Sequence, residues 1–433
     1  MSGMTVARKL SRSTRGSRGR LALFALLALV LAAAAEAIGS HKVAIGPGAI
    51  TLFPIIWGLL LGAAVSIQRF RPVPVGMQRA ATYVVEMGVL LLGVRLAFVV
   101  GHELPVLRQA SFALLFQEIG HLFGTVALSL PLAVLLRMGR SAVGACFSID
   151  REGSFAMVSE RFGPDSEEYR GVLGMYIFGS VVGALYVTLL ASLLAGSGIL
   201  SPLALAMGTG VGSGSVMAAS SAAIAAQYPE LANQIVALAT VSNLVTSLAG
   251  VYIGMFVALP LADRFYKLLT RGRKVEPAAA PDLPAAELES GSPSRVRPLP
   301  AILIALVTMF VSNAVHAGGV DPRALLGFAL VAAVVVAGLA IKRFTRLPAV
   351  AGTSALAILL TSPISPVADA VMSLVKPVEF LAMATPILVF AGLSIGKDLP
   401  ALKRIGWRIV PVGLMSFAAS FLVSALIAQV FLG

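Results

Sequence analysis

The hydrophobic residues of this chain form long runs, and the short polar loops between them carry most of the Lys and Arg. A helix of about 20 apolar residues spans the hydrocarbon core of a bilayer. We therefore predict an all-α, polytopic membrane protein with about eleven transmembrane helices and two re-entrant hairpins. The spans are predicted at residues 21–38, 48–67, 81–101, 111–136, 171–197, 231–262, 299–316, 323–341, 347–363, 379–396 and 405–432.

Basic residues set the orientation, because short cytoplasmic loops carry an excess of Lys and Arg. Residues 1–20 form a basic arm, which we expect to be disordered and cytoplasmic. Residues 21–262 form a first membrane half, 263–298 a polar cytoplasmic linker, and 299–433 a second half that ends outside. The run 21–38 also offers the small residues of a signal-peptide cleavage site, but the chain continues directly into further spans, which favours an uncleaved first span.

Two segments depart from the pattern of continuous apolar helices. Residues 201–230 contain Gly208-Thr-Gly-Val-Gly-Ser-Gly-Ser-Val-Met-Ala-Ala-Ser-Ser221, with four glycines at alternate positions and no charge. Non-helical backbone at membrane depth is tolerated where it is buried in protein or lines a cavity. We predict a re-entrant hairpin here, with close helix packing through small residues as the alternative. Residues 139–166 contain a second break, for which a solvated cytoplasmic loop is the alternative.

The two breaks correspond to each other when the chain is compared with itself. A shift of 66 residues pairs Gly144 with Gly210, Phe162 with Tyr228 and Tyr186 with Tyr252. The distribution of basic residues places the first break on the cytoplasmic side and the second on the outside. The two copies are then inverted, and inverted repeats around a midplane site are typical of secondary transporters.

The backbone of the two breaks is the first candidate binding site. Helix N-termini favour anions, and unwound carbonyl groups favour cations. In the charged first break, a carboxylate is suited to Na⁺ or H⁺, and an arginine to an anionic solute. The candidate residues are Gly144, Ser148, Asp150, Arg151, Glu152, Gly210, Gly212, Ser213, Gly214 and Ser215.

Polar residues inside the predicted spans are further candidates, because intramembrane charges are rare and often mark binding sites. Arg95 can contact a substrate or extend to the interface. Glu118 and His121 are three residues apart and share a helix face, which suits a proton relay or a structural hydrogen bond to a neighbouring helix. Asn243 lies in a polar cluster that either lines the site or bonds to another helix.

The composition narrows the class of protein. Of 433 residues, 58% are hydrophobic and 12% are charged, whereas soluble domains have about 25% charged residues. The net charge of +13 comes from the loops and the N-terminal arm, so we expect no nucleic-acid partner. The single cysteine, Cys146, and four scattered histidines form no metal motif, and no phosphate-binding loop is present. We therefore expect no metal, no cofactor and no enzymatic activity.

The breaks resemble those of known transporter families. Gly212-Ser-Gly-Ser-Val-Met-Ala-Ala-Ser-Ser221, followed by Glu230 and Ala237-Leu-Ala-Thr-Val241, is similar to a family of proposed bacterial inner-membrane exporters with a Gly-Ala-Ser-Ala-Ile-Ala-Ala motif. The inverted pair resembles ion-coupled carboxylate transporters, namely the group of 2-keto-3-deoxygluconate permease, glutamate–sodium symporter and citrate symporter. Their double-glycine tip is replaced here by Gly144-Ala-Cys146 and Gly208-Thr-Gly210. As a whole, the chain resembles a bacterial inner-membrane family with no assigned substrate.

Together these features predict a secondary active transporter of the bacterial inner membrane. We expect a small anionic metabolite, coupled to H⁺ or Na⁺, to bind between the two breaks and to cross by alternating access. The lipid bilayer is then its main environment, and assembly into a homo-oligomer is left open. The alternative is a polytopic protein with a non-transport role, such as an intramembrane enzyme or a partner subunit.

Overall fold

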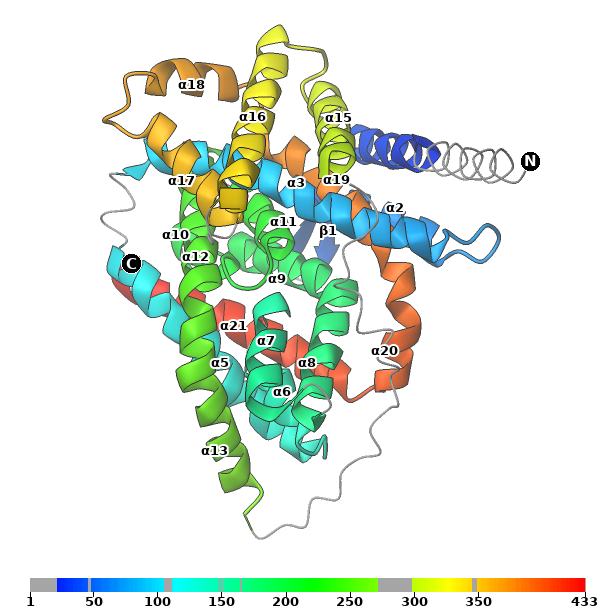
Figure 1. The fold of residues 1–433 in the computed structure, drawn as a ribbon, viewed down its shortest axis with the longest axis vertical. Helices are drawn as coiled ribbons and strands as arrows, with labels where there is room; N and C mark the ends of the chain where they lie inside the picture. The colour runs from blue at the N-terminus through cyan, green and yellow to red at the C-terminus, as the bar shows by residue number, and fades with distance from the viewer. Residues whose placement is uncertain are drawn as a thin grey trace, which may run out of the picture.

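The computed structural model describes residues 22–45, 48–104, 111–147, 149, 151–163, 166–271, 298–344 and 349–432. Within this part, the chain is built almost entirely from α-helices (Figure 1). The prediction of a helical protein with membrane-length apolar helices is confirmed. The basic arm 1–20 and residues 272–297 of the linker lie outside the described residues.

One short antiparallel hairpin interrupts the helices near the N-terminus. It pairs β1 (His41–Ile45) with β2 (Gly48–Leu52). Helix α2 (Pro54–Ile67) begins directly afterwards with a proline, whose fixed φ and missing N–H suit the first turn of a helix. The predicted span 48–67 is therefore wrong in its first part. Its β-branched residues follow a Gly-Pro-Gly sequence and favour a strand of a hairpin.

Seven helices of the described part are long and apolar enough to cross a membrane. They are α3 (Val75–His102), α5 (Ser111–Leu135), the continuous helix of α8, η1 and α9 (Glu167–Ser197), α15 (Pro298–His316), α16 (Pro322–Phe344), α19 with η5 (Phe380–Lys397) and α21 (Ile409–Leu432). Shorter apolar helices are Ala22–Ile38, α2, α11 (Gly214–Ala225) and α17 (Ala349–Thr361). The chain is thus an integral membrane protein by the length and composition of its helices.

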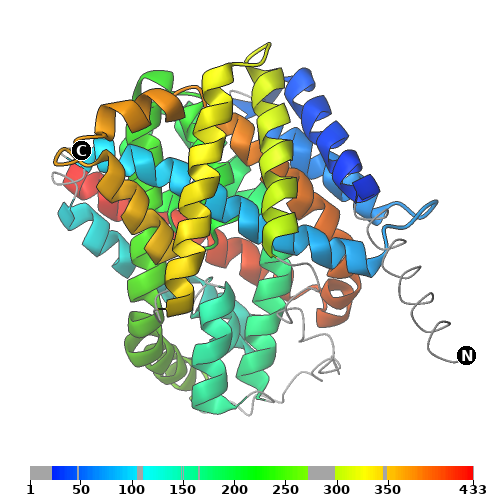
Figure 2. The same cartoon turned by 45° about the horizontal axis from the view of Figure 1, so that its top comes forward.

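Two packing groups combine helices from distant parts of the sequence. In the first, α2 packs on α19 through Gly62 and Gly392, where the two backbones approach too closely for a side chain. Helices α15 and α16 lie across α3 in this group (Figure 2). In the second group, α21 packs along α5, where Gly120 and Gly124 allow a close approach. Both groups therefore mix helices from the two membrane halves expected from the sequence.

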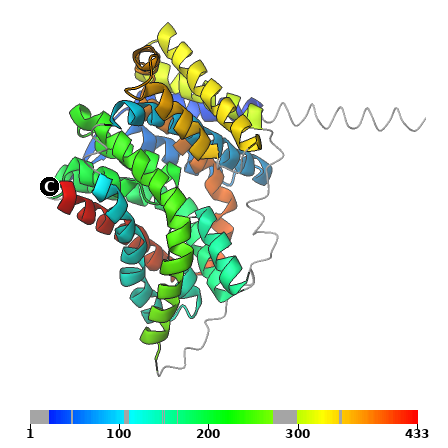
Figure 3. The same ribbon diagram turned by 60° about the vertical axis from the view of Figure 1, so that its left-hand side comes forward.

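Two long helices link these groups. The first is the helix Glu167–Ser197, in which the π turn η1 (Gly179–Gly183) joins α8 (Glu167–Phe178) to α9 (Ala184–Ser197). The second joins α12 (Ala232–Ile253), the π turn η3 (Gly254–Ala258) and α13 (Leu259–Leu269), and runs along the molecule in Figure 3. Helix α12 contacts both α3 and α5.

Two short helices were not expected from the sequence. Helix α18 (Ala368–Val375) lies between α17 and α19, and prolines before and after it prevent one continuous helix. Helix α20 (Leu399–Ile405) ends at Gly406, whose φ of +91° favours glycine. The last predicted span therefore begins at Ile409 rather than at residue 405.

Candidate functional site

Residues 139–163 form a helical hairpin around the first break. Helix α6 (Ser141–Cys146) leads to the break, and α7 (Arg151–Phe162) leads back from it. The end of α7 returns to the start of α6, since the guanidinium of Arg140 lies 5.8 Å from the centroid of the Phe162 ring. Both ends of the segment therefore lie on the same side of its tip.

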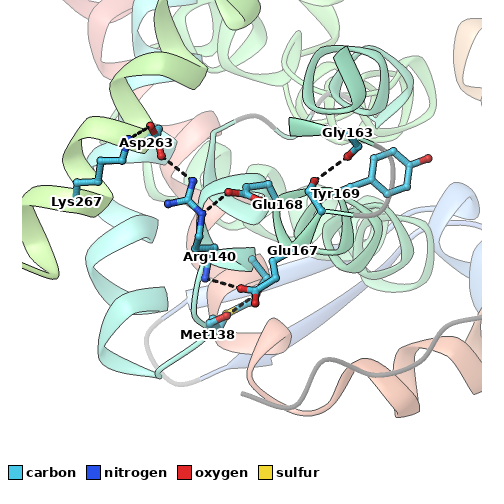
Figure 4. A network of polar contacts seen from close by, with 10 residues as sticks. Met138, Arg140, Gly163, Glu167, Glu168, Tyr169, Asp263 and Lys267 are labelled. Atoms are coloured by element: carbon cyan, nitrogen blue, oxygen red, sulfur yellow. Dashed lines mark hydrogen bonds and ion pairs between the residues drawn. The ribbon is translucent and has the colours of Figure 1, made fainter. Parts of the chain in front are cut away.

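A cluster of charged side chains fixes the base of this first hairpin (Figure 4). Arg140 Nε donates to Glu168 Oε1 at 2.5 Å, and Nη2 donates to Asp263 Oδ1 at 2.9 Å. Lys267 Nζ donates to the other oxygen of Asp263 at 2.6 Å. Burial opposes ionisation of Asp263, but the hydrogen bonds from Lys267 and Arg140 outweigh it and lower the pKa of that carboxyl. The cluster ties the start of α6 to α8 and α13.

Residues 201–228 form a second helical hairpin. Helices α10 (Pro202–Thr209) and α11 (Gly214–Ala225) are its arms, and a short 3₁₀ turn, η2 (Pro229–Leu231), follows it. Each arm begins with a serine, whose side chain accepts a hydrogen bond from the backbone N–H three residues later. These N-caps allow the chain to start a new helix twice within the segment.

Both ends of the second hairpin lie at the C-terminal end of α9. Helix α10 follows α9 after a short turn, and the hydroxyl of Tyr228, beyond α11, donates to Ala195 O at 2.8 Å. The first hairpin is held at the other end of the same continuous helix, because Arg140 bonds to Glu168 near its start. The two hairpins therefore enter from opposite ends of the helix Glu167–Ser197.

The tips of the two hairpins meet. Gly212, between α10 and α11, has a φ of +81°, a left-handed conformation that favours glycine. A Cβ atom at this position would lie 3.5 Å from Cδ1 of Ile149, which belongs to the first break. The two predicted breaks thus lie next to each other inside the protein.

Helix α12 holds the second tip through two polar side chains. Asn243 Nδ2 donates to Gly210 O at 2.8 Å and to Gly212 O at 3.0 Å. Ser242 Oγ donates to Met207 O at 2.8 Å and lies so close to Gly210 that a side chain there would clash. Carbonyl groups at the end of a helix lack partners within it, and these bonds satisfy them. Asn243 therefore bonds to the second hairpin and fixes the shape of its tip.

Glu118 and His121, both on α5, are buried near this tip. Thr246 Oγ1 donates to Glu118 Oε2 at 2.7 Å, and Thr246 lies one helical turn after Asn243. His121 Nδ1 forms a hydrogen bond with Ser420 Oγ on α21. The two side chains thus bond to different helices, which matches their structural alternative and leaves the proton relay a prediction.

A small cavity lies beside the second tip. It has a volume of about 40 Å³ between α3, α11, α12 and α17, and its wall includes Gly214, Thr240, Asn243, Thr353 and Ser354. This volume and these polar groups suit water or a small ion.

A larger cavity, which we call the charged cavity, lies farther along α3. Its volume is about 750 Å³. The helix Ala22–Ile38, α3, α15, the start of α19 and the adjoining ends of α11 and α12 surround it. Its ionisable wall residues are Glu36, Arg95, His316 and Glu379. In the described part of the chain, no group of three His, Cys, Asp or Glu side chains is placed to hold a metal ion.

The structure gathers most of the predicted site residues around the second tip and separates others. Those gathered are Gly210, Gly212, Ser213, Gly214, Ser215, Asn243 and Glu118, whereas His121 bonds to Ser420 on α21. Arg95 lies apart, in the charged cavity. It follows Val89, which touches Gly214, by six residues, or about 9 Å along the helix.

The structure describes only some of the candidate residues of the first break. Gly144 lies inside α6 and packs against the backbone of Glu168, so it serves helix packing and not the break itself. Ser148 and Asp150 lie outside the described residues, as do the side chains of Arg151 and Glu152 at the start of α7.

Several site residues were missed by sequence reasoning. Ser242 and Thr246 flank Asn243 in one polar stretch, and their spacing of four residues indicates a shared helix face that could have identified them. Glu36, His316 and Glu379 meet only through folding. No local pattern marks them as partners.

Comparison with family models gives a match to the family described as "Protein of unknown function (DUF3100)", over residues 33–268. The matched residues cover more than half of the chain and include both hairpins, α3, α5 and α12. Comparison with curated proteins and with solved structures gives no match.

Proposed function

We propose that this chain, which belongs to the DUF3100 family, is a secondary active transporter of the bacterial inner membrane. It moves a small anionic metabolite together with H⁺ or Na⁺ by alternating access. One observation carries the proposal: two helical hairpins enter from opposite ends of one membrane-length helix, and their tips meet. Secondary transporters commonly bind substrate where discontinuous helices of inverted repeats meet near the midplane.

The geometry of the hairpins supports an inverted repeat. Helices α7 and α11 each have 12 residues, and their first residues, Arg151 and Gly214, are 63 positions apart. Ile149 and Gly212, which lie next to each other, are also 63 positions apart. A two-fold axis between two copies brings equivalent residues together in this way. The helices thus favour a shift of 63 residues over the 66 found by matching residue types.

The tips supply groups for both an anion and a cation. Helix α11 begins at the second tip with Ser213 as its N-cap, where Ser213 Oγ lies 3.1 Å from Ser215 Oγ, and helix N-termini favour anions. The buried carboxyl of Glu118, with its Thr246 hydroxyl partner, suits H⁺ or Na⁺. The small cavity lined by Gly214 and Asn243 adjoins the start of α11.

The membrane topology follows from the same arrangement. We propose that both hairpins are re-entrant and that about eleven helices span the bilayer. The basic residues Arg137 and Arg140 at the base of the first hairpin favour the cytoplasm. The second hairpin then enters from the outside.

Transport by the full-length protein in proteoliposomes tests the proposal. Mono-, di- and tricarboxylates and inorganic anions are applied as concentration jumps on a solid-supported membrane, with and without Na⁺ and at acidic and neutral pH. We expect at least one anion to give a current that depends on H⁺ or Na⁺, and to raise the melting temperature of the purified protein. If no anion does either, the non-transport role is favoured instead.

A further inference from the structure

The charged cavity is unusual because its ionisable side chains converge among apolar helices. Arg95 comes from α3, Glu36 from the helix Ala22–Ile38, His316 from the end of α15, and Glu379 from the residue before α19. A cavity of about 750 Å³ is in the range that encloses small organic ligands. The cavity therefore has the volume of a ligand site, and its wall has the charges of one.

Arg95 is held in place by its backbone surroundings. Its Nε donates to Val378 O at 2.8 Å, and its side chain lines the charged cavity. Asn313 steadies the same loop, since its side chain donates to Pro377 O at 3.1 Å and accepts from Glu379 N at 2.7 Å. The planar fork of an arginine fits a carboxylate through two parallel hydrogen bonds.

Glu36 and His316 form a pair on the same wall. His316 Nδ1 lies 2.9 Å from Glu36 Oε2, and Ser312 Oγ donates to Oε1 at 3.2 Å. An ionised carboxylate only accepts hydrogen bonds, so we assign the hydrogen of the neutral imidazole to Nδ1 and leave Nε2 to take up a proton. The Glu36 side chain is 1% exposed and that of His316 is 35% exposed. The imidazole is therefore accessible to protons while the carboxylate is not.

The protonation state of His316 decides the charge of the cavity wall. Arg95 and Glu379 face the pair, and no other ionisable side chain of the described residues lines the cavity. With a neutral imidazole, the four side chains sum to −1, and with a protonated one they sum to zero. Charges inside a protein interact much more strongly than in water. An anion is therefore accepted more readily after His316 takes up a proton.

We propose that His316, held by Glu36, is the proton-binding group that couples H⁺ to the binding of a carboxylate at Arg95. This inference rests on the proposed transport function and goes beyond it, because it places a carboxylate and H⁺ at a second site, in the charged cavity apart from the tips. Nε2 takes a proton from water, and Nδ1–H keeps its hydrogen bond to Glu36. On the less acidic side of the membrane, Nε2 returns the proton to water, and the carboxylate loses a neighbouring positive charge.

Binding of succinate and citrate to the purified full-length protein, at about pH 5.5 and about pH 8, tests this inference. We expect wild-type affinity for one of them to be about tenfold higher at the acidic pH. His316→Gln keeps a side chain that can hydrogen-bond to Glu36, so it should bind with little pH dependence. Glu36→Gln removes one negative charge and should bind more tightly at the higher pH. His102→Gln, at the exposed end of α3, is the matched control and should behave as wild type.

The possible results separate the two proposals. If His316→Gln is folded and keeps the full pH dependence of the wild type, the role of His316 is refuted and the transport proposal stands. Binding that follows Na⁺ and not pH refutes it in the same way. If neither succinate nor citrate binds wild type at either pH, the carboxylate and its coupling to H⁺ are both rejected. The proposed function itself then depends on the wider anion panel.

Discussion

The two hairpins are held in place by different chemistry. The first is fixed at its base by ion pairs around Arg140, whose partner Asp263 also binds Lys267. The second is fixed at its tip by the neutral amide of Asn243. Lys267 is 63% exposed, so the ionic cluster lies near water, whereas the tip lies in the interior. Charges are placed where water can offset their desolvation, and a neutral group is used where it cannot.

This difference has a consequence for movement. Arg140 and Lys267 are partly exposed, so water can reach their side of these ion pairs, and the base of the first hairpin can rearrange more easily than a tip held in the interior. The second tip cannot leave α12 unless both hydrogen bonds of the Asn243 amide, to Gly210 O and Gly212 O, are broken. We therefore expect the second tip and α12 to move as one unit during transport, and the first hairpin to move relative to α13.

The largest effect on stability is expected from a substitution of Asn243. Asn243→Ala leaves the carbonyls of Gly210 and Gly212 without their side-chain donor, which should lower the free energy of unfolding by about 3 kcal/mol. Gln227→Ala is the matched control, because this amide bonds to Ser192 at the base of the same hairpin and should cost about 1 kcal/mol.

Thermal unfolding of the two variants, with the anion currents described above, measures this contrast. Asn243→Ala should also abolish the currents, since the tip loses its shape. Equal losses of stability in the two variants would show that the second hairpin is not anchored at its tip.

A smaller effect is expected where the tips touch. Gly212→Ala and Gly198→Ala both place alanine at a positive φ, +81° and +68°, and each should cost about 1 kcal/mol. Only Gly212 contacts the other hairpin, whereas a Cβ at Gly198 would meet open space. Gly212→Ala should therefore slow transport at least about tenfold, in line with a misplacement at the site, and Gly198→Ala should not. Similar rates in the two variants would mean that the contact between the tips has no part in transport.

Much of the fold was predictable from local patterns. The helical class and most of the long spans follow from runs of apolar residues near bilayer length. The β-hairpin at 41–52 was missed because its apolar residues merge with those of α2 in a simple hydropathy reading. The packing of α2 on α19 and of α5 on α21 joins distant parts of the chain, which no local pattern can reveal.

The candidate site was predictable only where its residues lie close together in the sequence. The alternate glycines from Gly208 to Gly214 marked the second tip, and Asn243 was found as a polar residue in an apolar helix. Gly144 was assigned to the first break, although it lies inside α6 two residues before that helix ends, because small residues suit both a break and close packing. Glu36 and His316 are 280 positions apart and meet only in the folded protein.

The smallest effect on stability is expected at the base of the first hairpin. There, the contribution of the ionic cluster can be measured through its dependence on pH. Because folding lowers the pKa of Asp263, its stabilisation is fully present above the unfolded value near 3.8 and is lost as the pH falls through the folded value. Asp263→Asn should therefore flatten the acid end of a plot of melting temperature against pH. At neutral pH it should cost only about 1 kcal/mol, since Arg140 and Lys267 are partly exposed and screened. Asp321→Asn, at an exposed turn before α16, is the control that should leave the acid slope unchanged. If Asp263→Asn and wild type lose stability in parallel on acidification, the ionic cluster does not hold the hairpin, and the contrast with the neutral tip disappears.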